Sequence, residues 1–253
     1  MGHHAQGDVL AFLDSDDIWH SRYLETQQKL IKKHPDAVAY FTEHEDIVGW
    51  GQFEWSVQTD FDTIMPEVIQ PLVLLRRSNE TPLKFQMSCC CVPKHIFSQL
   101  EPEPFRINGA EDTFFNALLA LLGPVVHTSA KPVAYRITER SASANRLKGS
   151  LDVLDVFEAL EPIYKEKADI KLYTEFQMIY AARRRNCAKY LMGSGRVSDA
   201  RAQFKASLKR NSSPLSILKS MGLFSASFLP VALQPKWPAP LRNQPRVDQQ
   251  LDR

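Results

Sequence analysis

The chain has 253 residues, of which 44% are hydrophobic and 24% are charged, and its formal net charge is +2. These ordinary values exclude a collagen-like, coiled-coil or wholly disordered chain and predict one or two globular domains. No apolar run approaches the ~20 residues of a membrane-spanning helix. The first six residues lack the basic start and apolar stretch of a signal peptide.

The charges and the cysteines are unevenly distributed along the chain. Residues 181–253 contain 14 basic and three acidic residues, which indicates that this third has a different kind of partner from the rest. The four cysteines, Cys89, Cys90, Cys91 and Cys187, have the spacing of neither a disulfide framework nor a zinc site. We therefore expect buried thiols in a reducing compartment, the cytoplasm.

Strand and helix patterns alternate through about residue 140, which is typical of an α/β domain. Asp8–Leu13 is a continuous apolar run followed by polar residues and predicts a strand buried on both faces. The elements expected after it are a helix at 21–33, a strand at 37–41, a loop-rich stretch at 42–83 with a helix near 67–76, a strand at 86–92, helices at 94–99 and 109–122, and strands at 125–127 and 132–136.

Beyond residue 150 the pattern is helical. We expect helices at 151–160, one or two over 163–192, one from Ser198 with Ala200, Phe204 and Leu208 on one face, and one that begins at Pro214. The last 24 residues contain five prolines and predict a disordered or loosely docked tail. The expected domains are therefore 1–149, 150–229 and 230–253.

Four polar residues follow the first predicted strand, namely Asp14, Ser15, Asp16 and Asp17. Carboxylates at the carboxyl end of a strand in an open α/β sheet lie where such sheets bind ligands. Their hard oxygen atoms suit Mg²⁺ or Mn²⁺, which in turn binds phosphates. On composition alone a turn that caps the following helix explains them better.

A second acidic pair, Glu111 and Asp112, opens the helix that continues through Phe114 and Phe115. A carboxylate at this point could act as a general base toward a hydroxyl group. The structural alternative is strong, because the helix dipole favours acidic residues in the first turn.

Three segments together resemble family 2 glycosyltransferases with the nucleotide-sugar (GT-A) fold. Gly2, Ala5 and the run Gly7-Asp8-Val9-Leu10-Ala11-Phe12-Leu13-Asp14-Ser15-Asp16-Asp17-x-Trp19 are similar to that family's small-residue turn, strand and DxD signature. Gly109-Ala110-Glu111-Asp112-x-Phe114-Phe115 resembles its later acidic motif, and Tyr135-Arg136 with Ser141 and Ser143 resembles the segment that closes its catalytic domain. The fold that this implies is a partial GT-A α/β domain over residues 1–149, followed by an all-helical C-terminal region.

The resemblance also implies an activity and the roles of particular residues. It implies inverting, metal-dependent transfer of a sugar from a nucleotide-sugar donor to a hydroxyl of a glycan or lipid-linked acceptor, in glycan or cell-surface polysaccharide synthesis. Asp14 and Asp16 would hold Mn²⁺ or Mg²⁺ on the donor diphosphate, and Asp112 would be the catalytic base, with Glu111 beside it. The implied donor-binding residues are Asp14, Ser15, Asp16, Asp17 and Trp19.

Two departures from the family are visible. The chain begins where the family's domain is already half built, so the resemblance implies that the N-terminal nucleotide-binding half is missing. Without that half the first strand would lie at an open sheet edge. Thr138 stands where the family often has a histidine, and threonine is a poor substitute for an imidazole ligand. His127 is close in sequence, but a structural role suits it better.

Other functional hypotheses remain open at this point. The chain could be a non-catalytic remnant, or one half of a split enzyme that acts as an interaction module. A nucleotidyltransferase would use the same carboxylate and metal chemistry. The genomic sequence upstream of Met1 and product analysis would distinguish these possibilities.

The basic helical third suggests a further partner. Its cations between Arg183 and Arg210 could bind anionic lipid headgroups, with Met221–Phe224 and Phe228–Leu229 in the membrane interface. This predicts a peripheral position at the inner face of a membrane, although most charge runs are simply solvated. No nucleic-acid partner is expected, because no recognised nucleic-acid-binding module is present.

Overall fold

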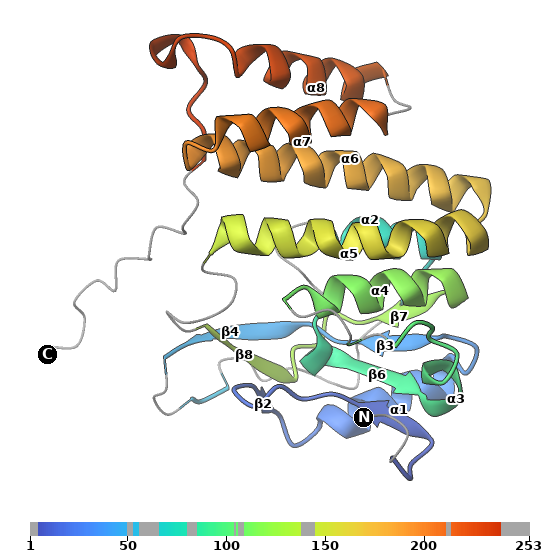
Figure 1. Cartoon of the computed structure of the whole chain (residues 1–253). Helices are drawn as coiled ribbons and strands as arrows, with labels where there is room; N and C mark the ends of the chain where they lie inside the picture. The colour runs from blue at the N-terminus through green and yellow to red at the C-terminus, as the bar shows by residue number, and fades with distance from the viewer. Residues whose placement is uncertain are drawn as a thin grey trace, which may run out of the picture. The chain divides into compact units, whose positions relative to one another are not determined.

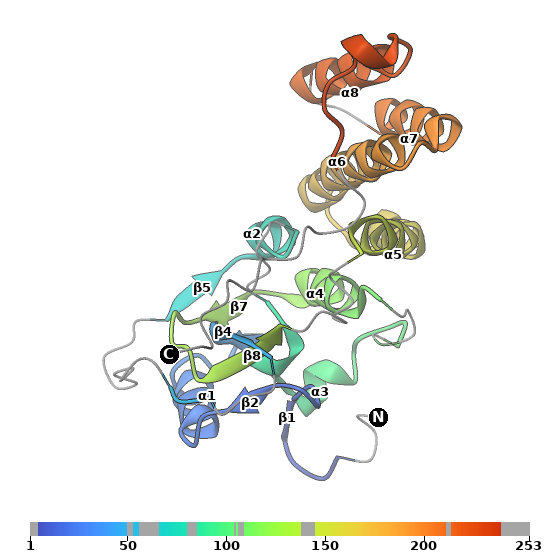
Figure 2. The ribbon, with the colours of Figure 1, turned by 90° about the vertical axis from the view of Figure 1, so that its left-hand side faces the viewer.

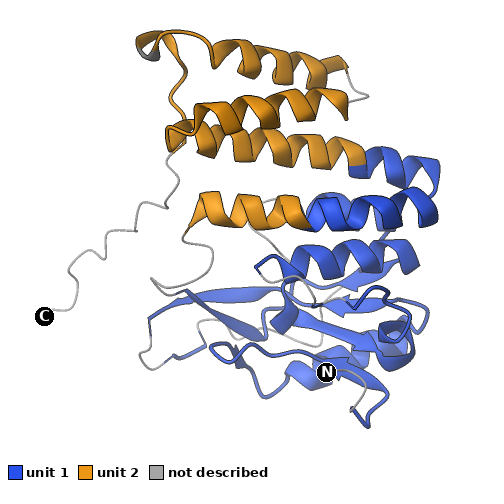
Figure 3. Cartoon of the chain, viewed as in Figure 1, with its two compact units in different colours: residues 1–138, 156–176 blue, residues 139–155, 177–253 orange. Residues whose placement is uncertain are grey.

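The computed structural model describes residues 5–49, 53–55, 66–79, 85–103, 105, 109–137, 145–210 and 214–238. The chain forms two compact units, of which unit 1 comprises residues 1–138 and 156–176 and unit 2 comprises residues 139–155 and 177–253 (Figure 3). The predicted fold class is confirmed, since mixed sheets with helices are followed by an all-helical C-terminal region (Figure 1). The domain limits expected from the sequence stay predictions.

Unit 1 contains two mixed sheets. The larger has the strand order β1 (Val9–Ala11), β6 (Cys90–Pro93), β3 (Ala39–Phe41), β7 (Val125–His127) and β5 (Glu67–Ile69). The smaller has the order β2 (Ile18–Trp19), β8 (Val133–Ile137) and β4 (His44–Val48). The β3–β7 and β4–β8 pairs are parallel and the other pairs are antiparallel.

The helices of unit 1 bury their apolar sides against the larger sheet and against one another. Helices α1 (Tyr23–Lys33) and α4 (Glu111–Leu122) cover opposite faces of this sheet (Figure 1). In α4 every residue from Thr113 to Ala120 is buried, because another helix packs on its outer side. That helix is the C-terminal part of α5 (Arg146–Lys167), whose Tyr164 hydroxyl donates a 2.6 Å hydrogen bond to the carbonyl of Ala117. The other helices are α2 (Pro71–Arg77), α3 (Lys94–Phe97) and the first part of α6 (Ile170–Gly193).

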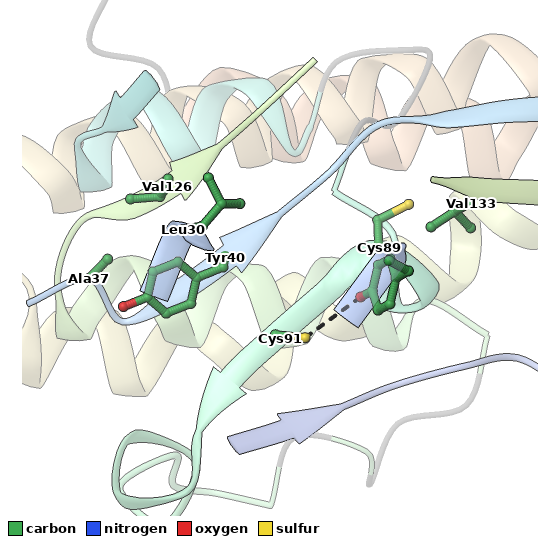
Figure 4. Packing of buried hydrophobic residues seen from close by; sticks show 8 residues of the cluster. Leu30, Ala37, Tyr40, Cys89, Cys91, Val126 and Val133 are labelled. Atoms are coloured by element: carbon green, nitrogen blue, oxygen red, sulfur yellow. Dashed lines mark hydrogen bonds between the residues drawn. The ribbon is translucent and has the colours of Figure 1, made fainter. Parts of the chain in front are cut away.

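A buried cluster joins α1 to three strands of the larger sheet (Figure 4). Its members are Tyr23, Leu30, Ala37, Tyr40, Cys89, Cys91, Val126 and Val133. Cys91 belongs to this cluster and its neighbour Cys90 does not, as expected of successive side chains in β6, and Cys89, just before the strand, also belongs to it. All four cysteines are buried free thiols, which confirms that prediction. Burial raises the pKa of the Cys91 thiol to about 12.

The structure corrects three expectations about strands. β1 is not buried on both faces, because it lies at the edge of the larger sheet and only Leu10 of its three residues is buried. The stretch 42–83 holds two strands, β4 and β5, that the polar composition concealed. Residues 86–92 are not one continuous strand, since a one-turn 3₁₀ helix, η2 (Met87–Cys89), precedes β6.

The helix expected to end at residue 160 also continues further. Pro162 lies inside α5, which runs to Lys167.

The regular elements that the structure describes in unit 2 are all helices. It contains the first part of α5, the second part of α6, α7 (Val197–Lys209), α8 (Pro214–Ala226) and a short 3₁₀ helix, η4 (Val231–Leu233). α6, α7 and α8 lie side by side in both views (Figure 1 and Figure 2). Ala200 and Phe204 are fully buried, as their spacing predicts, and Leu208 is half-buried.

Arginines hold these helices together, so this part of the charge run is not a solvated face, whereas Lys205 and Lys209 of the same run are exposed. Arg184 is buried and donates 2.6 Å hydrogen bonds to the Tyr180 hydroxyl and to Oε1 of Gln203. The guanidinium groups of Arg201 and Arg210 lie over aromatic rings, at 3.7 Å from the centroid of Phe228 and 4.3 Å from that of Tyr180. Arginine stacks well on aromatic faces, so these cations serve as packing groups.

The start of the predicted tail is folded onto unit 2. Trp237 lies 6.1 Å from the ring of Phe204, and the Pro238 backbone passes directly over Gly193. Residues 239–253 lie outside the described part of the chain. Within the described residues, no helix combines the length and the apolar character needed to cross a membrane.

Candidate functional site

The acidic loop Asp14–Asp17 follows β1 and leads into β2. The amide of Asp17 donates a 3.1 Å hydrogen bond to the carbonyl of Asp14, which closes a tight turn. Asp14 and Ser15 are exposed, Asp16 is half-buried and Asp17 is buried. The loop therefore presents its first carboxylates outward, while the last one points into the protein.

Asp17 anchors this loop to β8. Its Oδ1 accepts a 2.9 Å hydrogen bond from the Arg136 amide, and the Arg136 Nε donates a 2.9 Å bond to the carbonyl of Asp16. The same guanidinium also donates to the carbonyl of Gly49. Oδ2 of Asp17 is buried without a hydrogen-bond partner among the described residues. The pKa of Asp17 is raised above its usual value, mainly because the carboxyl group is buried.

Trp19 takes part in packing. Its ring stacks on Tyr23 with 4.1 Å between centroids, and its indole N–H donates a 2.8 Å hydrogen bond to the carbonyl of Ser88. The ring also packs against the buried cluster of unit 1. These contacts hold the residue at the end of β2 in place, and they use both its face and its polar atom.

The second acidic motif lies at the start of α4, as predicted. Glu111 is exposed, and its Oε2 accepts a 2.9 Å hydrogen bond from the Gly109 amide. Asp112 is half-buried at the residue level, and desolvation of its carboxyl group raises its pKa to about 7. The charges of Glu111 and Asp14 raise this pKa further, while a hydrogen bond from the Met87 amide lowers it.

The structure therefore brings the two acidic motifs together. Asp14 lies close enough to Asp112 for its charge to raise the pKa of Asp112, and Glu111 acts on the pKa of Asp14 in the same way. Desolvation and the charges of Asp17 and Asp16 also raise the pKa of Asp14. Five carboxylates thus meet at this site, namely Asp14, Asp16, Asp17, Glu111 and Asp112, and the pKa values of Asp14 and Asp112 are raised in part by their charges.

The turn η2 connects the two motifs, and sequence reasoning did not find it. Ser88 is fully buried, its Oγ accepts a 3.0 Å hydrogen bond from the Asp14 amide, and its carbonyl binds Trp19. The adjacent Met87 amide binds Asp112. A lone serine between Met87 and the three cysteines is the only sequence signal, and it resembles an ordinary buried residue of a strand.

Two further side chains border the site. The Tyr135 hydroxyl has its pKa raised to about 12, first by burial and then by the charges of Asp17 and Asp112. The His44 ring lies 5.3 Å from that of Tyr135, and burial lowers its pKa. Tyr135 appeared in the sequence only as part of a closing motif. His44 was hidden in a stretch predicted to be loop.

The remaining candidates do not join the site. The buried His127 has its Nε2 3.9 Å from Oε1 of Glu43 and its ring 5.6 Å from that of Phe85. Thr138, Ser141 and Ser143 lie outside the described residues, as does Gly2. Where the structure describes the chain, no three His, Cys, Asp or Glu side chains are arranged as a complete metal site.

A comparison with known families finds a match for the N-terminal part of the chain. Residues 3–96 match the model of the family described as "Glycosyl transferase family 2". No curated protein matches the chain. The matched segment includes the Asp14–Asp17 loop and η2. Residues 3–96 are thus similar to part of a family 2 glycosyltransferase domain, and this similarity supports a glycosyltransferase in general.

Proposed function

We propose that the protein is an inverting, metal-dependent glycosyltransferase that transfers a sugar from a nucleotide-sugar donor to an acceptor hydroxyl. The observation that carries this proposal is the junction of the two acidic motifs at η2, with Asp112 at a pKa of about 7. A general base works best when its pKa lies near the pH at which the enzyme operates. The four free cysteines suit the cytoplasm, a reducing compartment.

A divalent cation suits the chemistry of this loop. The Asp14 carboxyl is exposed, and neighbouring carboxylates oppose its ionisation, so a bound cation would relieve the repulsion. Mg²⁺ is commonly held by one or two carboxylates together with substrate phosphates, and an incomplete protein ligand set is compatible with that arrangement. Asp14 and Asp16 would hold the cation, Mg²⁺ or Mn²⁺, which when bound stabilises negative charge on the leaving diphosphate.

Asp112 acts on the acceptor in this proposal. Its carboxylate accepts the proton of the acceptor hydroxyl while the hydroxyl oxygen forms a bond to the anomeric carbon of the sugar. The bond from that carbon to the diphosphate breaks, and the electron pair leaves with the nucleoside diphosphate. Attack opposite the leaving group inverts the anomeric centre. Glu111 raises the pKa of Asp112 and so tunes the base.

The remaining donor-site assignments divide into two groups. Ser15 is exposed beside Asp14 and can contact the donor, whereas Asp17 and Trp19 hold the loop in place through Arg136 and Ser88. We propose a hydroxyl of a glycan or a lipid-linked glycan as the acceptor, in glycan or cell-surface polysaccharide synthesis.

Calorimetric titration of the whole chain with UDP and with GDP, with and without Mn²⁺, tests the donor site. We expect Mn²⁺-dependent binding of one nucleotide, loss of that binding in Asp16→Ala, and no loss in Asp36→Ala, which replaces an exposed aspartate elsewhere. Absence of binding by the folded wild-type chain would contradict the proposal and favour a non-catalytic half.

Asp112→Asn tests the base. We expect Mn²⁺-dependent nucleotide binding within about twofold of wild type, because the substitution leaves Asp14 and Asp16 in place. Sugar transfer should fall by at least about 100-fold, the usual contribution of a general base. A variant that transfers sugar at the wild-type rate would remove Asp112 from the mechanism.

A further inference from the structure

Helix α8 and the chain after it expose an unusual number of large apolar side chains. These side chains have exposed fractions between 44% and 68% and are Leu215, Leu218, Met221, Leu229 and Leu233. We call them the α8 apolar face. Leu215, Leu218 and Met221 follow one another at three-residue spacing, so they lie along one side of the helix. Large apolar side chains exposed together along one side of a helix mark an interaction site.

The opposite side of α8 is held by α7 through polar contacts. Ser220 is buried, and its Oγ lies 3.0 Å from the Oγ of Ser207. The Arg201 guanidinium donates a 2.8 Å hydrogen bond to the carbonyl of Ser227. The helix therefore buries Ser220 on its inner side and exposes Leu215, Leu218 and Met221 to the solvent. Since these contacts fix its rotation, the α8 apolar face is a built feature of unit 2.

The charge around this face has one sign. Residues 177–238 contain eleven lysines and arginines and a single acidic residue, Asp199. Asp199 forms a 2.7 Å ion pair with Arg196, the residue that precedes its helix α7. Lys205, Lys209, Lys219 and Lys236 are exposed, and Lys219 lies on α8 itself. A formal charge of +10 over these 62 residues attracts anionic surfaces.

We propose that the α8 apolar face and the surrounding lysines bind the surface of an anionic lipid bilayer. A helix that combines an apolar side with a basic flank lies in the plane of the interface, where apolar burial and attraction to anionic headgroups add together. A second copy of the chain fits less well, because two regions that each carry a formal charge of +10 would repel one another. A nucleic acid would leave the apolar side chains in water. The proposal does not depend on the transfer reaction.

Vesicle co-sedimentation of the whole chain tests the proposal. We expect binding to vesicles of phosphatidylcholine with 30% phosphatidylglycerol, weak binding to pure phosphatidylcholine, and at least about a tenfold weaker affinity for the anionic vesicles in 0.5 M NaCl, because salt screens the charges. Equal binding to both kinds of vesicle would overturn the electrostatic part.

Two substitutions separate the apolar contribution from the basic one. Leu218→Glu should weaken binding to the anionic vesicles about tenfold or more, since it removes a buried leucine from the interface and adds a repelled charge. Lys219→Gln should weaken it by about fivefold, as expected for one basic residue near an anionic surface. Both side chains are exposed, so the fold should be kept, and circular dichroism checks this.

Ile170→Glu provides the matched control. Ile170 is 77% exposed at the start of α6 and lies outside the α8 apolar face, so its substitution should leave vesicle binding unchanged. Equal effects of Ile170→Glu and Leu218→Glu would overturn the assignment to α8. A lipid-free dimer that Leu218→Glu dissociates, together with unaltered vesicle binding, would overturn it in favour of a second copy. Tight binding of RNA without binding of vesicles would overturn the bilayer proposal in favour of a nucleic-acid partner.

Discussion

At the scale of single residues, Asp112 combines a cost in stability with a chemical use. The folded protein raises its pKa from 3.8 to about 7, chiefly by desolvation. Between these two values the unfolded chain has lost the proton while the folded chain retains it, so folding stability falls as the pH rises toward 7. The same shift gives the carboxyl group the proton affinity that a base requires near neutral pH.

Asp112→Asn should therefore stabilise the protein above neutral pH. The expected gain in the free energy of unfolding is near zero at pH 4, grows as the pH rises to 7, and then levels off. Three pKa units set an upper limit of about 4 kcal/mol. Urea denaturation between pH 4 and 8 measures the gain, with the exposed Asp36→Asn as the control. A gain that does not vary with pH would contradict this account.

Ser88 is the second residue on which the site depends. Ser88→Ala removes the acceptor of the Asp14 amide in a fully buried position. Loss of such a partner costs about 1–3 kcal/mol, and we expect this decrease in the free energy of unfolding together with weaker Mn²⁺-dependent nucleotide binding. The exposed Ser98→Ala, which also removes a hydroxyl hydrogen bond, should change neither quantity measurably. Identical results for the two variants would show that Ser88 does not position the loop.

At the scale of elements, the end of α6 carries a close contact with the segment that follows η4. A Cβ atom on Gly193 would lie 2.1 Å from the carbonyl oxygen of Pro238, and backbone cannot yield as a flexible side chain does. The glycine therefore permits residues 234–238 to pack against unit 2, where Trp237 approaches Phe204.

Gly193→Ala should displace this segment. We expect faster proteolytic cleavage near Lys236 and a lower melting temperature than in wild type. The control is Gly149→Ala in α5, where no atom would lie within 4 Å of the new Cβ. Since alanine is a better helix former than glycine, that control should be neutral or stabilising by up to about 1 kcal/mol. Equal cleavage rates for Gly193→Ala and wild type would show that the segment is not held by this contact.

At the scale of the whole molecule, the thiols report on both compact units. Cys89, Cys90 and Cys91 lie in unit 1 and Cys187 lies in unit 2, and all four are buried. A thiol reagent such as Ellman's should label none of the four in the native protein within minutes and all four in guanidinium chloride. Rapid labelling of Cys187 alone in the native protein would contradict this expectation and would indicate that unit 2 opens independently of unit 1.

Local patterns along the sequence were sufficient for several features of this protein. The alternation of strands and helices, the acidic residues after β1 and at the start of α4, the burial of the cysteines and the Ala200–Phe204 face of α7 follow from periodicity and from end signals. Each depends on residues within a few positions of one another. The polar composition of 42–83, by contrast, hid β4 and β5, because partly exposed strands carry many polar residues.

Only the tertiary structure decided which distant residues meet. The contact between Ser88 and Asp14, the place of Tyr135 beside four carboxylates, and the strand order of the larger sheet depend on how strands far apart in sequence pair. The same holds for the arginines of unit 2, which look like a solvated face in sequence and serve as packing groups in the fold. A sequence pattern shows which side chains share a face, but packing alone determines whether that face meets protein or solvent.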